Sequence, residues 1–327
     1  MFHVLKGYSL RQDINKTSKT VSSSLQLAIL LEISANKPGN VSREAHFKTT
    51  RYEHFLASAV AVEPSFVKAA ERGIMMHYRE IAPNNIYLGE IVKEAVVSAN
   101  AWQHGGNTLL GTILLLSPIA VAAGITLTGK EKFAVSKLRE NIKLVVESTT
   151  PSDAVAVYEA INIANPNGLV DKAPTLDVND PTSKKRILEE GTTLFDIFKI
   201  SAPYDSISRE WVENYPITFG IGLPYFTQQL KKTGSLNTAI VHTFLKVLSE
   251  VPDTLIARKV GLDRAEEVSE KAKEVLGAGG LTTLHGREKL SAFDKELRRP
   301  ANQHNPGTTA DIMAAILAIS ILNGYRP

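Results

Sequence analysis

The stretch NTLLGTILLLSPIAVAAGITLTG, Asn107 to Gly129, contains no charged residue and is long enough to organise the whole fold. Roughly 20 apolar residues can span a bilayer, so a membrane helix is one interpretation. The other is a helix buried on all sides at the centre of a helical domain. We favour the buried helix, because Pro118 and Gly124 interrupt the run, neither end carries an aromatic residue, and no second span accompanies it.

The segments on both sides of this run repeat their apolar residues at helical spacing. The four clearest stripes are Phe55, Ala59, Val62 and Phe66; Leu138, Ile142 and Val145; Leu236, Ile240, Phe244 and Val247; and Leu262, Ala265, Val268, Ala272 and Val275. Alternating strand patterns, successive βαβ units and repeats of fixed period are missing from the sequence. We therefore predict an all-α fold, a single large multi-helix domain over residues 1–327 with a buried central apolar helix.

One segment breaks the helical pattern. Residues 165–184, NPNGLVDKAPTLDVNDPTSK, are rich in Pro, Asn and Asp, which predicts a long irregular loop. A linker between two domains is the alternative. We prefer a crossing loop within one domain, because the helical patterns before and after it have the same character.

The composition restricts the possible functions. The 327 residues are 43% hydrophobic and 22% charged, with a net charge of +3 and only short basic clusters, so we expect no nucleic-acid partner. The lack of cysteine excludes disulfides, thiolate zinc sites and cysteine nucleophiles. The first 20 residues contain no apolar core of signal-peptide length, so we expect a cytoplasmic protein without a membrane partner. The sequence is compatible with a homo-oligomer and does not specify one.

Three turns beside apolar helices have a similar composition. They are SANKPGNVSREAH (34–46), HGGNTLLG (104–111) and HNPGTTADIMAAILAI (304–319). Glycine allows a ligand or another backbone to approach closely, and an exposed helix N-terminus attracts phosphate. Lys37 and Arg43 would add mobile positive charge to the first turn. The alternative is ordinary turn chemistry, in which Thr308 and Asp311 form a capping box and Asp311 only closes its own helix.

Carboxylates and histidines add candidates. Asp253 follows Pro252 where a helix should begin, so it is either an N-cap or a ligand. If Asp253 and Asp311 converge beside bound phosphates, Mg²⁺ would be needed to bridge the two sets of negative groups. His46 and His304 flank the turns, although a lone histidine is commonly a packed or surface residue. No histidine spacing indicates zinc.

The order of these motifs resembles the triphosphoribosyl-dephospho-coenzyme A synthase family. The matching pieces are Lys37-Pro38-Gly39, Ala45-His46, Asn107-Thr108 with Gly111, Asp253-Thr254, and Pro306-Gly307 with Ala310-Asp311, over a resemblance that runs from about Leu25 to the C-terminus. The resemblance implies an all-α enzyme that uses ATP as substrate and Mg²⁺. Such an enzyme joins the ribose C1 of ATP to the 2′-hydroxyl of dephospho-CoA, or a related acceptor, and releases adenine.

The resemblance also implies site residues. Mg²⁺ would lie on Asp253 and Asp311, which would also stabilise the positive charge at the ribose, and His46 would take the hydroxyl proton. The nucleotide-binding set is Lys37, Pro38, Gly39, Asn40, Arg43, Asn107, Thr108, Gly111, His304, Asn305, Gly307, Thr308 and Thr309. We expect Lys37, Asn107 and Thr308 to surround a common cavity.

The sequence departs from the family pattern at two motifs. Lys48, Thr49 and Thr50 stand in the segment where the family has two aspartates, and Leu109 and Leu110 replace a histidine and a lysine. These losses leave two other hypotheses open. One is a Mg²⁺-dependent nucleotide or phosphoester hydrolase on the same frame, and the other is a non-catalytic nucleotide-binding helical protein.

Overall fold

The computed structural model describes residues 2–129, 133–166, 175–299 and 302–327. Every regular element in these ranges is helical, so the all-α prediction is confirmed. The α-helices are α1 (Phe2–Ser34), α2 (Tyr52–Ala61), α3 (Glu63–His77), α4 (Leu88–Ala101), α5 (Leu110–Leu127), α6 (Val135–Glu147), α7 (Pro151–Ala164), α8 (Ser183–Glu190), α9 (Leu194–Ser201), α10 (Ser206–Val212), α11 (Leu223–Thr233), α12 (Leu236–Glu250), α13 (Thr254–Val260), α14 (Leu262–Gly277), α15 (Leu284–Leu297) and α16 (Gly307–Leu322). Two 3₁₀ turns (Pro83–Asn85, Gly280–Thr282) and one π-helix (Thr218–Gly222) complete the described elements.

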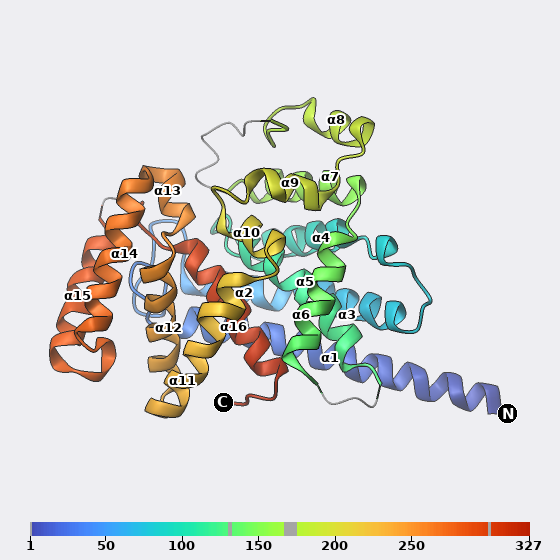
Figure 1. Ribbon diagram of the computed structural model, residues 1–327, viewed down its shortest axis with the longest axis horizontal. Helices are drawn as coiled ribbons and strands as arrows, with labels where there is room; N and C mark the ends of the chain where they lie inside the picture. The colour runs from blue at the N-terminus through green and yellow to red at the C-terminus, as the bar shows by residue number, and fades with distance from the viewer. Residues whose placement is uncertain (1, 130–132, 167–174, 300–301) are drawn as a thin grey trace.

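The apolar helix predicted from the sequence is α5, and it lies at the centre of the molecule (Figure 1). It packs against α1, α3, α4, α6 and α16. Among the described helices it alone is long and apolar enough to cross a membrane, yet 83% of it is buried inside the protein. The burial confirms the interpretation of this run as a core helix.

A proline inside α5 is compensated by a tryptophan from another helix. Pro118 has no N–H, so the carbonyl of Leu114, four residues earlier, loses its partner within the helix. The indole Nε1 of Trp211 in α10 donates to this carbonyl at 3.0 Å. The helix therefore continues through Pro118, and α10 is fixed to the centre of the fold.

This contact leads to a stability prediction. Trp211→Phe should lower the free energy of unfolding by about 1–3 kcal/mol, because it leaves a buried carbonyl unpaired. Urea unfolding followed by circular dichroism measures the loss. Trp102→Phe is the matched control, since Trp102 is 65% exposed and should change stability by less than about 0.5 kcal/mol. Equal effects of the two substitutions would contradict this role for the indole.

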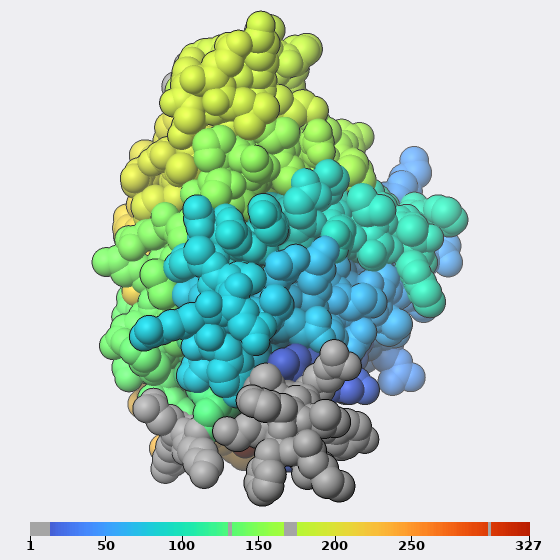
Figure 2. All heavy atoms as spheres, turned by 90° about the vertical axis from the view of Figure 1, so that its right-hand side faces the viewer, coloured from blue at the N-terminus to red at the C-terminus, as the bar shows by residue number. Residues whose placement is uncertain are grey.

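The remaining helices cover the centre from two sides. Helices α3 and α4 occupy the middle of one face, with α8 at its upper end (Figure 2). On another side α12 packs against α14, and α14 against α15 (Figure 1). The predicted apolar stripes are buried or pack against the core, except for Leu262, which is 58% exposed. Leu262 is the first residue of α14 and lies at the rim of a cavity, which accounts for its exposure.

The predicted loop over residues 165–184 is described in part. Residues 167–174 lie outside the described residues, and α8 already begins at Ser183. Between them, Leu176 is buried, and its carbonyl accepts a hydrogen bond from the Tyr158 hydroxyl of α7 at 2.5 Å. This end of the loop is therefore held against the domain.

Candidate functional site

A cavity of about 900 Å³ opens between the end of α1, the start of α5 and helices α7, α9, α10, α13 and α16. This volume is near the upper end of the range of about 300–1,000 Å³ for small-molecule sites. One part of the wall is polar and comes from α1, α5, α13 and α16. Another part is apolar and comes from α7 and α9.

Half of the site residues predicted from the sequence line this cavity. Asn40, Asn107, Thr108, Gly111, Asn305, Gly307, Thr308 and Asp311 line it. Lys37, Pro38, Gly39, Arg43, His46, Asp253, His304 and Thr309 do not line it. The three turns therefore converge as expected. Of the three residues expected around one cavity, Asn107 and Thr308 are present, and Lys37 lies behind the wall.

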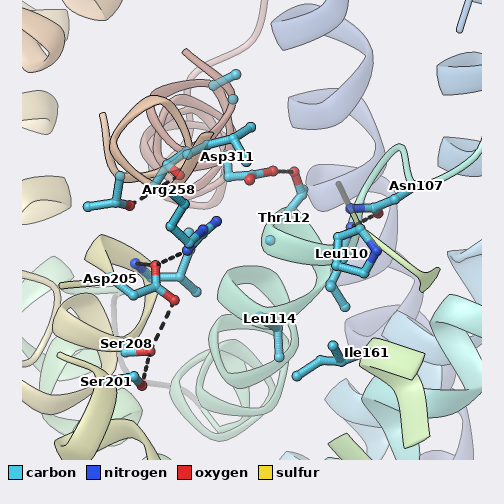
Figure 3. Close-up of a pocket in the computed structure, with 18 of the residues that line it drawn as sticks. Asn107, Leu110, Thr112, Leu114, Ile161, Ser201, Asp205, Ser208, Arg258 and Asp311 are labelled. Atoms are coloured by element: carbon cyan, nitrogen blue, oxygen red, sulfur yellow. Dashed lines mark hydrogen bonds and ion pairs between the residues drawn. The ribbon is translucent and has the colours of Figure 1, made fainter. Parts of the chain in front are cut away.

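Asp311 is the central carboxylate of the polar wall (Figure 3). Its Oδ1 accepts a hydrogen bond from the Thr112 hydroxyl of α5 at 2.5 Å. The neighbouring Gly111 leaves room for this contact, since a Cβ there would stand 2.1 Å from Oδ2 of Asp311. The N-cap position of α16 is Pro306 and no side chain caps this helix, so the interpretation of Asp311 as the cap of its own helix is wrong.

The pKa of Asp311 is shifted toward neutral pH. Burial and, to a smaller extent, the negative charges of Glu32 and Asp253 raise its pKa to about 7. The hydrogen bond from Thr112 acts in the opposite direction. A cation that enters the cavity would stabilise the charged form of this carboxylate.

Glu32, in the last turn of α1, was missed in the sequence. It is 7% exposed and lines the same cavity as Asp311. Its Oε1 lies 2.9 Å from Nζ of Lys37 but makes no hydrogen bond within the described residues. Burial raises the pKa of Glu32, and the nearby Lys37 lowers it. The signal was present in the sequence, because Glu32 is the one charged residue in the apolar run LQLAILLEI.

Lys37 does not supply the mobile charge that the sequence suggested. The side chain is 1% exposed and turns back onto the end of α1, where it pairs with Glu32. It also donates to the backbone carbonyls of Ala35, at 3.1 Å, and of Glu32. These bonds satisfy carbonyls that the end of a helix leaves unpaired.

The Lys37-Pro38-Gly39 turn has the same structural function. Gly39 has φ +74°, which favours glycine, and a Cβ there would lie 2.8 Å from Cβ of Leu297. Its N–H donates to Oδ1 of Asp294 at 2.8 Å. The turn thus fixes α1 to α15 and leaves only Asn40 on the cavity.

Asp253 is an N-cap, one of the two roles considered from the sequence. Its Oδ1 accepts from the N–H groups of Leu255 and Ile256, and its Oδ2 accepts from the N–H and hydroxyl of Thr309, all at 2.7–3.1 Å. Both oxygens are thus engaged in joining α13 to α16, away from the cavity wall. Glu32 and Asp311 line the cavity instead, together with Asp177 and Asp205.

The other predicted polar residues stabilise the helix starts around the cavity. Oδ1 of Asn107, three residues before α5 begins, accepts from the N–H of Leu110 at 3.1 Å. The Thr108 hydroxyl pairs with Ser58 at 2.7 Å, and the Thr308 hydroxyl accepts from Thr254 at 3.3 Å. Their polar atoms define the cavity edge between α5 and α16.

Three predicted residues lie elsewhere. Arg43 and His46 are exposed, and Nδ1 of His46 accepts a 3.5 Å hydrogen bond from the N–H of Tyr52. His304 contacts Arg264 at 3.4 Å, and burial together with this positive charge lowers its pKa. The placement of His46 gives no support to its expected role as the base.

The cationic groups of the cavity come from positions that the sequence did not predict as ligands. Lys48 lies on one side, and Arg258 and Lys259, in the last turn of α13, lie on another. Nη1 of Arg258 lies 3.4 Å from Oδ1 of Asp205, the residue that caps α10 (Figure 3). Arg258 and Lys259 lie in the same short helix, α13, that Asp253 caps. The sequence therefore identified this helix but not its cationic residues.

Metal-binding capacity is confined to carboxylate pairs. The described residues contain no cluster of three or more histidines, aspartates and glutamates. Glu32 and Asp311 supply two carboxylates, and Thr112 adds a hydroxyl on the same wall. Mg²⁺ binds proteins through one or two carboxylates together with substrate phosphates and water, so this donor set fits Mg²⁺ bound with a nucleotide.

Fold and site together define an all-α protein whose described residues surround a large cavity, with both carboxylate and cationic side chains in its wall. Residues 18–327 match the sequence profile of the ATP:dephospho-CoA triphosphoribosyl transferase family. The chain belongs to this family.

Individual proteins with this activity in their names are similar to the chain. A 2-(5''-triphosphoribosyl)-3'-dephosphocoenzyme-A synthase from Klebsiella pneumoniae is 33% identical over 98 residues, which span 30% of this chain and 32% of that protein. A protein from Malonomonas rubra with the same activity in its name is 22% identical over 321 residues, which span 95% and 90% of the two chains. A crystal structure described as a triphosphoribosyl-dephospho-CoA synthase from Archaeoglobus fulgidus has a TM-score of 0.60 at 24% identity, covers 83% of this chain and shares its fold.

Proposed function

We propose that this protein transfers the triphosphoribosyl group of ATP to the 2′-hydroxyl of dephospho-CoA, or of a closely related acceptor, and releases adenine. Family membership supports this activity. The observation that carries the proposal is a cavity of about 900 Å³, in which three turns of the family pattern meet with four carboxylates and three cations. A transfer between two nucleotides requires both to enter one enclosed space.

Magnesium dependence is part of the proposal. Glu32 and Asp311 would hold Mg²⁺, with the Thr112 hydroxyl beside them, in place of the expected pair Asp253 and Asp311. The metal would offset the charge of the triphosphate next to two carboxylates. The position of both carboxylates on the cavity wall and the raised pKa of Asp311 support this assignment.

The side chains of the cavity would act on the ribose. Cleavage of the bond between ribose C1 and adenine develops positive charge at the ribose, and nearby carboxylates stabilise such charge. Asn107 and Thr308 would hold the sugar and phosphates at the edge between α5 and α16.

The acceptor is the least constrained part of this proposal. Lys48, Thr49, Thr50, Leu109 and Leu110, where the sequence departs from the family pattern, all line the cavity. The departures therefore alter the substrate wall itself, which favours an acceptor related to dephospho-CoA as the alternative. The cytoplasmic location, the lack of nucleic-acid and membrane partners, and any homo-oligomer stay predictions.

The test is an incubation of the protein with Mg-ATP and dephospho-CoA, followed by chromatography of the products. We expect free adenine and the coupled product in equal amounts. Free phosphate without adenine would support the hydrolase hypothesis instead. An intact mixture, together with a melting curve unmoved by millimolar Mg-ATP, would support the non-catalytic hypothesis.

A further inference from the structure

We propose that Arg258 and Lys259 bind the diphosphate of the nucleotide acceptor, and that the acceptor's organic arm lies along the apolar wall formed by α7 and α9. This inference rests on the proposed function. It assigns to the acceptor a part of the cavity distinct from the Glu32–Asp311 end.

The guanidinium of Arg258 is held in position by one partner and has donors left for a ligand. Within the described part of the chain, its one polar contact is the 3.4 Å ion pair with Asp205. The side chain is 32% exposed and lines the cavity, so it is accessible to a ligand there. Arginine is suited to phosphate because this fork matches two phosphate oxygens.

Asp205 holds Arg258 from below and is itself fixed (Figure 3). One of its oxygens accepts from the N–H of Ile207, and the other accepts from the Ser208 hydroxyl at 3.3 Å. Ser208 in turn accepts from Ser201 at 2.7 Å. The guanidinium therefore rests on a chain of hydrogen bonds through α10 and α9, which limits its loss of side-chain entropy when an anion binds.

Lys259 adds a second cation on the same turn of α13. Its Nζ donates to Oδ1 of Asn305 at 2.7 Å, and both residues line the cavity. This bond turns the ammonium toward the start of α16. Two neighbouring cations, one a fork and the other a point charge, suit a ligand with two linked phosphates.

The α13 end carries the cations Arg258 and Lys259 beside Asp205, whereas the other end carries the carboxylates Glu32 and Asp311, and this difference assigns the two substrates to different ends. Figure 3 shows the Asp311–Thr112 pair on one side of Arg258 and the Asp205–Ser208–Ser201 chain on the other. Carboxylates attract a phosphate only when a divalent cation accompanies it, whereas Arg258 and Lys259 attract a phosphate that carries no metal. The metal-bound triphosphate of ATP therefore fits the Glu32–Asp311 end, and the acceptor's diphosphate fits the α13 end.

The apolar wall continues from the α13 end. Leu114, Ile161, Ile197 and Phe198 line this part of the cavity. Beyond its diphosphate, dephospho-CoA has a long arm with few charged groups, and such an arm gains from apolar contact. A single phosphate ion or a free nucleotide triphosphate would leave this wall unused.

The test is equilibrium titration of the full chain with three ligands in turn, dephospho-CoA, phosphate-free pantetheine and Mg-ATP. Arg258→Gln should weaken dephospho-CoA binding about 10–100-fold and change pantetheine or Mg-ATP binding by less than about threefold. The dephospho-CoA affinity of Arg258→Lys should lie between those of the unchanged protein and of Arg258→Gln. Lysine keeps the positive charge but lacks the planar fork of donors. Arg209→Gln is the matched control, since Arg209 pairs with Glu213 on α10 away from the cavity and should bind as the unchanged protein does.

The outcomes separate this inference from the proposed function. A loss of Mg-ATP affinity with normal dephospho-CoA affinity would overturn the inference, as would unchanged binding of all three ligands. Wild-type protein that binds dephospho-CoA through Arg258 but releases no adenine would uphold the site and refute the transfer. Lys259→Met repeats the test if the melting curve of unliganded Arg258→Gln indicates that this variant is not folded.

Discussion

Asp311→Asn should weaken the binding of Mg-ATP more than tenfold, or by at least about 1.4 kcal/mol, and leave binding of metal-free dephospho-CoA within about threefold. Asparagine keeps the size of the side chain and can still accept the hydrogen bond from Thr112. It removes the charge that offsets Mg²⁺. Calorimetric titration with Mg-ATP, and with ATP in the presence of a chelator, measures the effect of the metal separately.

The same substitution should raise the stability of the free protein at high pH. The pKa of folded Asp311, about 7, is above that of an unfolded aspartate. Such a group contributes stability below its unfolded pKa, and this contribution is lost as the pH rises through 7. Asp311→Asn should therefore equal the unchanged protein near pH 3, below the unfolded pKa, and exceed it by up to about 4 kcal/mol at pH 8.

Asp263→Asn provides the matched control for both measurements. Asp263 is an exposed aspartate in the first turn of α14, away from Asp311, so neither Mg-ATP affinity nor the pH dependence should change. An Asp311→Asn variant with full Mg-ATP affinity would refute the metal role. The Thr112 contact would then be a purely structural link between α5 and α16.

The fold was predictable because its signals are periodic and local. The apolar run of α5 and the stripes of α6, α12 and α14 each reflect the helical period of 3.6 residues, and burial follows from that period. Helix starts at Asp253 and Asn107 were marked by residues that accept hydrogen bonds from backbone N–H groups. None of these inferences required knowledge of which helices touch.

The site was predictable only as a set of turns. Sequence cannot specify which atoms of a turn face a cavity, so Lys37 and Asp253 were assigned to ligands while their polar atoms bind the protein's own backbone. Glu32 and Arg258 were missed for the converse reason. Each lies inside a helical pattern, and only the packing of α1 and α13 against α16 brings both to the cavity.

Lys37→Met should be the most destabilising single substitution considered for this chain, with a loss of about 3–5 kcal/mol in the free energy of unfolding. It leaves the buried carboxylate of Glu32 without its partner at 2.9 Å. It also removes the donor to the carbonyls of Ala35 and Glu32 at the end of α1. Urea unfolding at pH 7 measures the loss.

Matched variants and pH separate the ion pair from general side-chain effects. Lys143→Met is the control, because Lys143 is 58% exposed, pairs with Glu147 at 3.8 Å and should contribute less than about 1 kcal/mol. Without Lys37 the folded pKa of Glu32 rises further above its unfolded value, so the loss should grow as the pH increases from 5 to 8. Adding Glu32→Gln to Lys37→Met should recover part of the stability, since the double variant buries no unpaired charge. A Lys37→Met protein that stays fully stable but no longer binds Mg-ATP would reverse this assignment, and Lys37 would then be the phosphate ligand that its motif first suggested.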